Sequence, residues 1–134
     1  MSSKKPLPHP TADTKPFWDG CRAHELRFQK CGECGHIRWP ASFLCPKCHS
    51  RDTAWIRAKG CGKIYSYVVY HRAYHQAFEE EVPYVVALVE LEEGPRMLTN
   101  IVGSRPEEVG CDMPVVVAWE DIKEGIALPK FRIV

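Results

Sequence analysis

Four cysteines in two close pairs are the residues whose types and spacing most clearly indicate chemistry. Cys31 and Cys34 form the first pair, Cys45 and Cys48 form the second, and ten residues separate the pairs. This spacing is typical of a tetrahedral zinc site in which each pair forms a tight turn, called a knuckle, that presents two sulfurs to one ion. Because four thiolates leave no position for water, we expect the zinc to stabilise the fold rather than to take part in catalysis.

Other roles for these cysteines fit the sequence less well. Disulfides form in oxidising compartments, and the polar, proline-rich first residues lack the apolar segment that directs export, so we expect a cytoplasmic protein. Four thiolates could also hold iron, although zinc is more typical of a short ribbon. His36 and His49 follow the knuckles and are expected to be exposed neighbours. The remaining cysteines are interpreted as ordinary small apolar residues: Cys21, Cys61 and Cys111.

The elements that must position the four cysteines are short strands. Alternating apolar and polar residues predict strands over residues 26–30, 37–39 and 53–58, which together would form a three-stranded zinc ribbon. A short helix over residues 17–23, with Phe17 and Trp18 on its apolar face, is expected to precede them, although Gly20 weakens this helix.

A different pattern begins near residue 60. Segments rich in β-branched and aromatic residues predict five further strands, over residues 63–71, 83–91, 96–102, 113–121 and 126–134, the last one broken by Pro129. Five short strands separated by turn signals indicate a small closed or partly open barrel, because closure removes exposed strand edges. No apolar run in the sequence approaches the length of a membrane span.

The charge is divided unevenly along the chain. Residues 22–72 contain ten Lys and Arg against three acidic residues, whereas residues 73–134 contain five Lys and Arg against twelve acidic residues. One interpretation is that the two halves attract each other across an interface. Another is that the basic half faces an anion, such as a phosphate group.

Several stretches resemble a known family over residues 16–133. They are Pro16-Phe-Trp-Asp-Gly, Leu26-Arg-Phe-Gln-Lys-Cys-Gly-Glu-Cys-Gly, Cys45-Pro-Lys-Cys, Gly62-Lys-Ile-Tyr-Ser-Tyr-Val-Val, Val82-Pro-Tyr-Val-Val-Ala-Leu-Val-Glu-Leu-Glu-Glu-Gly, Leu98-Thr-Asn-Ile-Val-Gly and Gly110-Cys-Asp-Met-Pro-Val. They resemble the prokaryotic family in which a rubredoxin-like zinc ribbon is followed by an OB-fold. The resemblance implies a mainly β protein with an N-terminal arm and short helix (1–24), a four-cysteine zinc ribbon (25–59) and a five-stranded OB-fold barrel (60–134).

The resemblance also implies a function. Members of this family are similar to non-catalytic accessory subunits of thiolase-superfamily enzymes, such as a thiolase, a synthase or an aldolase, and are thought to help these partners bind acyl-CoA. This chain is therefore expected to act in a hetero-oligomer, with the bond chemistry in the partner. The cations and the aromatic ring that could bind CoA are Arg38, Trp39, Lys47 and Lys63, although Trp39 could equally cover the core of the ribbon.

Contacts with a partner protein are expected at two places. Phe17 and Trp18 could dock on a partner or on the ribbon itself. The long connection after residue 71 is expected to be functional, because long connections in compact domains often are. The candidate contact residues of this loop and of the strand end that precedes it are His71, Arg72, Tyr74, His75 and Phe78.

The sequence also allows two other functions. As an alternative, the chain could be a zinc-ribbon and OB-fold protein that binds single-stranded nucleic acid, but phosphates would be repelled by an acidic barrel. The polar residues whose types suit acid–base chemistry are His71, Arg72, His75 and Glu79. Because no nucleophile with a partner base accompanies them, we do not expect the chain to be catalytic alone.

Overall fold

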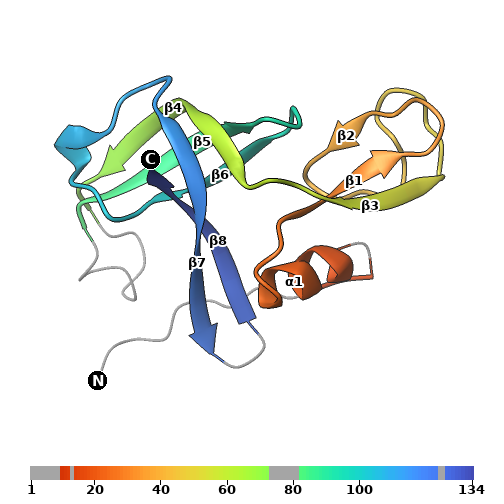
Figure 1. The fold of residues 1–134 in the computed structure, drawn as a ribbon, viewed down its shortest axis with the longest axis horizontal. Helices are drawn as coiled ribbons and strands as arrows, with labels where there is room; N and C mark the ends of the chain where they lie inside the picture. Colours follow the sequence, from red (N-terminus) through yellow and green to blue (C-terminus); the bar gives the residue numbers. More distant parts are fainter. Residues whose placement is uncertain (1–9, 13, 73–81, 124–125) are drawn as a thin grey trace.

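The computed structural model describes residues 10–12, 14–72, 82–123 and 126–134. Within these residues the protein is mainly β, with one short α-helix, a three-stranded sheet and a closed five-stranded barrel (Figure 1). The predicted fold class is therefore confirmed. The three-stranded sheet, which we call the ribbon, lies to one side of the barrel.

The ribbon consists of β1 (Arg27–Cys31), β2 (Ile37–Arg38) and β3 (Thr53–Arg57), in the order β2-β1-β3. All neighbouring strands are antiparallel, as the alternating pattern and the short connections predict. In this register Gln29 lies opposite Arg38, and Cys31 lies opposite Thr53. A sheet of this size buries little apolar surface, so its stability has to come in part from other sources.

The barrel is formed by β4 (Cys61–Tyr70), β5 (Tyr84–Leu91), β6 (Arg96–Ile101), β7 (Pro114–Lys123) and β8 (Ile126–Ile133), and a 3₁₀ turn, Pro106–Glu108, lies between β6 and β7. The strand order β4-β5-β6-β8-β7 closes the sheet on itself. Every second residue of β5 is buried, and the inward side chains meet those of the other strands in one core. Its largest fully buried members are Phe131, Ile64, Met97, Val89 and Val115.

Pro129 does not break the last strand, which differs from the sequence-based expectation. It lies within β8 and is paired with Trp119 of β7. Its carbonyl oxygen points towards β6, where it accepts a hydrogen bond from Thr99 Oγ1 (2.9 Å). Because the backbone nitrogen of a strand residue points to the same side as its carbonyl, the missing N–H of Pro129 faces β6. There the ladder is reduced to one pair, Ile101 with Phe131, so no hydrogen bond is lost.

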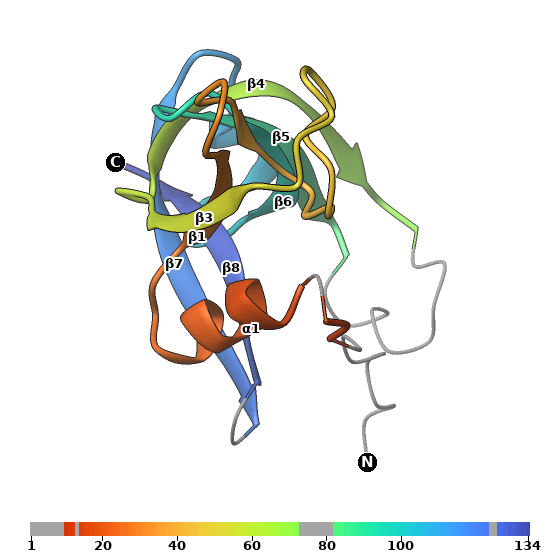
Figure 2. The same cartoon turned by 90° about the vertical axis from the view of Figure 1, so that its right-hand side faces the viewer.

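The helix α1 (Lys15–Arg22) lies between the ribbon and the barrel and contacts both β1 and β8 (Figures 1 and 2). Its residue Phe17 is fully buried, with its ring centroid 4.2 Å from that of Trp39 in the ribbon. Glycine is needed at position 20 of the helix because a Cβ there would lie only 2.6 Å from the carbonyl oxygen of Glu25. In the described residues, no helix has the length and apolar character that crossing a membrane requires.

Truncation of Phe17 tests whether α1 joins the two β units. We expect Phe17→Ala to lower the free energy of unfolding by about 3–5 kcal/mol, because it removes a buried ring from the junction. Phe43→Ala is the matched control, since Phe43 is 63% exposed, and it should cost less than about 1 kcal/mol. Denaturant unfolding followed by tryptophan fluorescence measures both. Equal costs for the two variants would show that the junction contributes little.

Candidate metal centre and adjoining cleft

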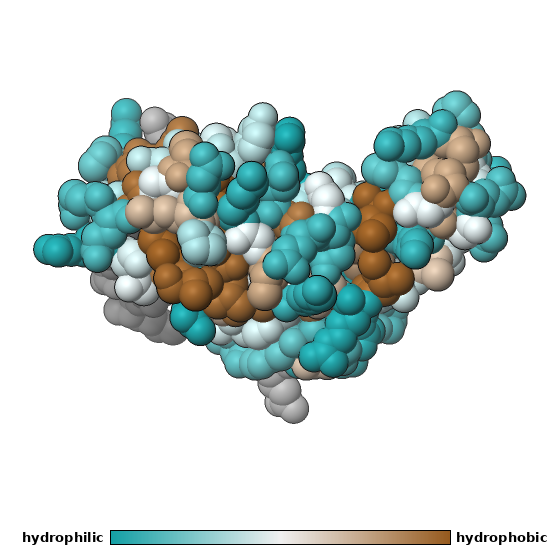
Figure 3. Space-filling model, turned by 45° about the horizontal axis from the view of Figure 1, so that its top comes forward, coloured by the Kyte–Doolittle hydropathy of each residue, from teal (hydrophilic) through white to brown (hydrophobic). Residues whose placement is uncertain are grey.

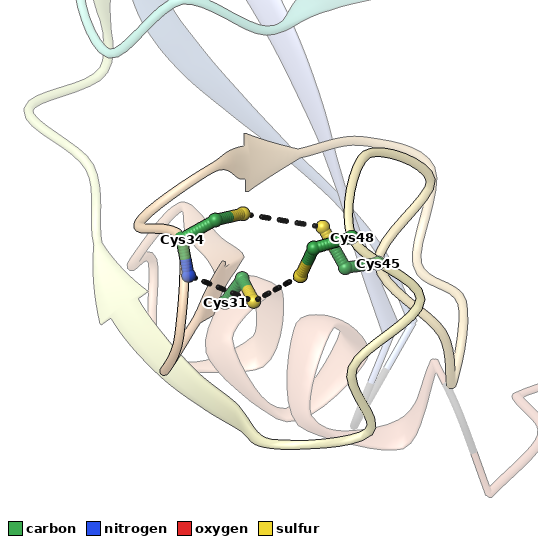
Figure 4. A group of neighbouring side chains, drawn as sticks. All are labelled: Cys31, Cys34, Cys45 and Cys48. Atoms are coloured by element: carbon green, nitrogen blue, oxygen red, sulfur yellow. Dashed lines mark hydrogen bonds between the residues drawn. The ribbon is translucent and has the colours of Figure 1, made fainter.

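The four knuckle cysteines meet at one end of the ribbon (Figure 4). Their sulfurs all lie within 4.8 Å of one another, with 3.5 Å between Cys31 Sγ and Cys48 Sγ and 3.5 Å between Cys34 Sγ and Cys45 Sγ. Tetrahedral zinc with Zn–S bonds of about 2.3 Å places its sulfurs about 3.8 Å apart. The observed separations bracket this value, so the cluster is consistent with a structural zinc site.

The two knuckles have the same local geometry. In each, the first cysteine N–H donates to a carbonyl five residues later, and its own carbonyl accepts from an amide four residues later. The bonds are Cys31 N to His36 O (2.9 Å), Cys45 N to Ser50 O (2.9 Å), Gly35 N to Cys31 O (3.0 Å) and His49 N to Cys45 O (2.8 Å). The fourth residue after the first cysteine is left-handed in both, with φ of 77° at Gly35 and 64° at His49. Neither His36 nor His49 belongs to the cluster.

Backbone amides set the protonation of the sulfurs. The amide of Cys34 lies 3.4 Å from Cys31 Sγ and is the main reason that the pKa of Cys31 is lowered to about 6. The amide of Cys48 lowers the pKa of Cys45 in the same way. The pKa of Cys48 is instead raised to about 12: the amide of Ser50 favours its thiolate, but hydrogen bonds with the neighbouring sulfurs, Cys31 first, outweigh that effect. The backbone amides therefore favour the thiolate, the form in which cysteine binds a metal ion, at the first cysteine of each knuckle.

The other cysteines lie outside the cluster. Cys21 is fully buried in α1, and burial raises the pKa of its thiol to about 12, so it behaves as the small apolar residue that we expected. Cys61 is half-buried at the start of β4, and Cys111 is exposed in the turn before β7, which gives Cys111 no packing role.

Arg38 is buried in the ribbon, with only 4% of its surface exposed. Its Nη2 donates to the carbonyl oxygen of Ser42 (2.9 Å) and to Thr53 Oγ1 (2.8 Å). The same loop is held by Gln29, whose Oε1 accepts from Ser42 N (2.8 Å). The side chain of Arg38 thus connects the segment that leads to the second knuckle with the strand that leaves it.

A cleft of about 700 Å³ separates the ribbon from the turn between β5 and β6. Figure 3 shows this side of the molecule, where a hollow divides a smaller lobe from the rest. Arg38, Trp39 and Lys47 line the cleft from the ribbon, so three of the four predicted CoA-binding residues come together. Lys63 does not line it; its Nζ lies on the barrel, 3.9 Å from Asp112 Oδ1.

The barrel wall of this cleft was not predicted from the sequence. Glu93 and Pro95, in the turn between β5 and β6, line it opposite the ribbon. Glu93 is held there by the amide of Lys59, which donates to its Oε2 (2.9 Å). The sequence Glu-Glu-Gly-Pro is typical of a turn, but no local signal could place this turn against a knuckle more than forty residues earlier in the chain.

The predicted partner-contact residues are separated by the fold. Phe17 is buried against the ribbon, whereas Trp18 is half-buried and lines a cavity of about 210 Å³ together with Trp39 and the exposed Leu98. His71 and Arg72 are exposed at the end of β4, beside a further cavity. Tyr74, His75 and Phe78 lie outside the described residues, as does Glu79.

Comparisons with known proteins match both β units. Residues 18–54 match the family profile "ChsH2, rubredoxin-like zinc ribbon domain", and residues 55–120 match "ChsH2, C-terminal OB-fold domain". A "DUF35 domain-containing scaffold protein" from Methanocaldococcus jannaschii is 41% identical over 96 residues, which are 71% of this chain and 67% of that protein.

Two further relatives cover nearly all of this chain. The "Probable enoyl-CoA hydratase alpha subunit" from Thermomonospora curvata is 41% identical over 128 residues. The match covers 96% of this chain, but the chain spans only 40% of that relative. A chain of the solved structure described as "Ltp2-ChsH2(DUF35) aldolase" is 40% identical and superposes with a TM-score of 0.85, covering 94% of this chain and 98% of that one.

The left-handed residue of the first knuckle can be tested by substitution. A Cβ at Gly35 would meet no atom within 4 Å, so Gly35→Ala should act through backbone strain alone and cost about 1 kcal/mol of stability. Gly35→Asn should cost less, because Asn tolerates this conformation better than Ala. Thermal unfolding of the zinc-loaded chain measures both effects. If Ala were as well tolerated as Gly, the positive φ would not be required.

Proposed function

The chain belongs to the ChsH2/DUF35 family of zinc-ribbon and OB-fold proteins, and from this premise we propose that it is a non-catalytic accessory subunit of a thiolase-superfamily enzyme that acts on acyl-CoA thioesters. The observation that carries the proposal is the match to the chain of the Ltp2-ChsH2(DUF35) aldolase, which covers nearly the whole of both chains. Similarity over only one unit would support the fold alone. The carbon–carbon bond chemistry would reside in the partner subunit.

The first part of the proposal is that the knuckles hold a structural Zn²⁺. Three observations support this zinc site. The sulfurs are separated by distances that suit tetrahedral zinc, backbone amides favour the thiolates, and the described cluster contains no fifth ligand group. The zinc would supply folding energy that the small ribbon sheet lacks. It would have no part in the reaction, because four thiolates fill its coordination shell.

The second part is that the cleft beside the ribbon receives the CoA portion of the substrate. Lys47 is exposed at its rim and offers a mobile cation for a phosphate, and the half-buried ring of Trp39 offers a surface for the adenine. The opposite wall carries Glu93, whose carboxylate would repel a phosphate, so the phosphate is expected to lie on the ribbon side. Lys63 does not line this cleft and would meet another part of the ligand.

The third part concerns the partner protein. Trp18 and Leu98 border a cavity between α1 and the barrel, and His71 and Arg72 border another at the end of β4. We propose these residues as contacts with the thiolase-like subunit, together with Tyr74, His75 and Phe78 of the long connection. Phe17 would act indirectly, by holding α1 and therefore Trp18 in place.

The nucleic-acid alternative has little support from the barrel surface. An OB-fold binds single strands with cations and stacking aromatic rings on its sheet. Here Tyr65 is half-exposed on β4, but its ring is covered by Arg96, whose guanidinium carbon lies 3.8 Å from the ring centroid. Arg96 is in turn paired with Glu90 (3.2 Å). Tyr65 and Arg96 are thus engaged with each other rather than available to a base and a phosphate.

Affinity purification tests the accessory role. With the intact chain as bait in its source organism, we expect a thiolase-superfamily protein to co-purify in a stable complex. Cys45→Ser should lose both zinc and the complex, because three thiolates and a hydroxyl hold zinc poorly and the ribbon then unfolds. Cys111→Ser, outside the cluster, is the control and should retain both. Recovery of RNA that is released by salt would support the alternative instead.

Charge reversal at the cleft tests the CoA site. In the purified complex we expect Lys47→Glu to weaken acyl-CoA binding about tenfold, the effect of losing one charged hydrogen bond and placing an anion beside a phosphate. Lys30→Glu makes the same change at an exposed ribbon position that does not line the cleft, and it should leave the affinity nearly unchanged. Isothermal titration with an acyl-CoA measures both. Equal effects would exclude Lys47 as a specific contact.

A further inference from the structure

The buried guanidinium of Arg38 lacks a counter-charge among the amino-acid side chains. Of its nitrogens, Nη2 is hydrogen bonded, whereas Nε and Nη1 are buried without a partner. No carboxylate lies within ion-pair distance of Arg38 in the part of the chain that the structure describes. A buried cation is strongly destabilising unless an opposite charge compensates it, so we expect negative potential near Arg38.

The acidic residues nearest in sequence or in the cleft do not provide it. Glu25 is engaged by Arg27 (3.4 Å) and Arg57 (3.6 Å). Glu33 and Asp52 are exposed. Glu93 shares the cleft with Arg38, and its Oε1 is also buried without a hydrogen-bond partner, but the two side chains form no ion pair; Glu93 Oε2 accepts from Lys59 N.

The position of Arg38 in the sheet places it beside the cysteine cluster instead. Arg38 lies opposite Gln29, and Thr53 lies opposite Cys31, so all four side chains share one face of the ribbon. The hydrogen bond from Arg38 to Thr53 runs across this face towards the position of Cys31. The second hydrogen bond reaches Ser42, three residues before Cys45. The guanidinium therefore lies between the segments that carry the two knuckles.

We propose that Arg38 is a positioning residue of the metal centre, whose positive charge balances the zinc tetrathiolate and whose hydrogen bonds hold the second knuckle against the first. This role rests on the zinc of the proposed function but not on its partner or on CoA. Four thiolates and one Zn²⁺ carry a net negative charge, and a fixed cation behind them lowers the cost of burying both groups. It also explains why a guanidinium that lines the cleft is turned into the ribbon rather than exposed.

The test compares zinc affinity in variants of the full-length chain. Arg38→Met removes the charge and the hydrogen bonds, Arg38→Lys keeps the charge, and Lys30→Gln removes one exposed charge next to Cys31 as the control. We expect Arg38→Met to weaken zinc binding about tenfold or more, Arg38→Lys to recover most of the affinity, and Lys30→Gln to change it less than about twofold. Competition with a chromogenic chelator measures these affinities. If Arg38→Met is insoluble, Arg38→Gln replaces it.

A spectroscopic measurement separates charge balance from general stability. With Co²⁺ in place of Zn²⁺, the thiolate-to-metal charge-transfer band should move to lower energy in Arg38→Met, because the thiolates lose a nearby positive charge. Arg38→Lys should restore the band, and Lys30→Gln should not shift it. A variant that is merely less stable would bind less Co²⁺ with an unchanged band, and this result would overturn the proposal.

Other outcomes would also overturn it. Equal zinc affinity in Arg38→Met and Lys30→Gln would remove any role for Arg38 at the metal. Equal losses in Arg38→Met and Arg38→Lys would assign Arg38 to hydrogen bonding without charge balance. Unchanged zinc affinity combined with weaker acyl-CoA binding by the complex would make Arg38 an anion contact of the cleft. An unmodified chain that holds no zinc would refute the metal itself, which distinguishes that failure from failure of this proposal.

Discussion

The convergence of four cysteine sulfurs within 4.8 Å is the constraint on which the ribbon depends. Sulfurs so close together cannot all be anionic without a cation, and backbone amides already stabilise two of them as thiolates. The surrounding sheet has strands of only two to five residues and could not fix the knuckles by packing alone. A metal ion at this point would fix the loops on both sides of it, including the residues that form one wall of the cleft.

The helix α1 connects the ribbon to the barrel. Phe17 places an aromatic ring against Trp39 of the ribbon, and the same helix lies along β8. At its C-terminal end, His24 is stacked on Trp119 of β7 with 5.4 Å between the rings, and its Nε2 is hydrogen bonded to Asp121 (2.9 Å). The ribbon and the barrel are therefore joined by a shared apolar core rather than by a flexible linker. The cleft and the apolar cavity both lie along this junction, where two units contribute walls that neither has alone.

The barrel illustrates that a fold does not determine a ligand. The outer face of β4, β5 and β6 exposes Val68 and Leu98. On this face Arg96 lies over Tyr65 and is paired with Glu90, and Lys63 is paired with Asp112. Such a surface is suited to contact with another protein, whereas nucleic acid requires available cations. The basic residues are concentrated in the first half of the chain, which includes the ribbon, so the two halves of the chain differ in charge.

The sequence by itself determined the features that depend on local spacing. Each of these features is encoded within a few neighbouring residues: the knuckles with two residues between their cysteines, the strands of alternating apolar residues, and the turns at Gly and Pro. These predictions are confirmed.

Only the tertiary structure decided what depends on distant neighbours. Pro129 continues a strand because its missing N–H faces a gap in the ladder beside β6. Phe17 is buried because Trp39 covers it. Arg38 and Lys63 were alike as basic residues of the same half of the chain, but one is enclosed in the ribbon and the other is exposed on the barrel. Burial and counter-charge arise from segments brought together in space, and no periodicity in a single sequence specifies which segments meet.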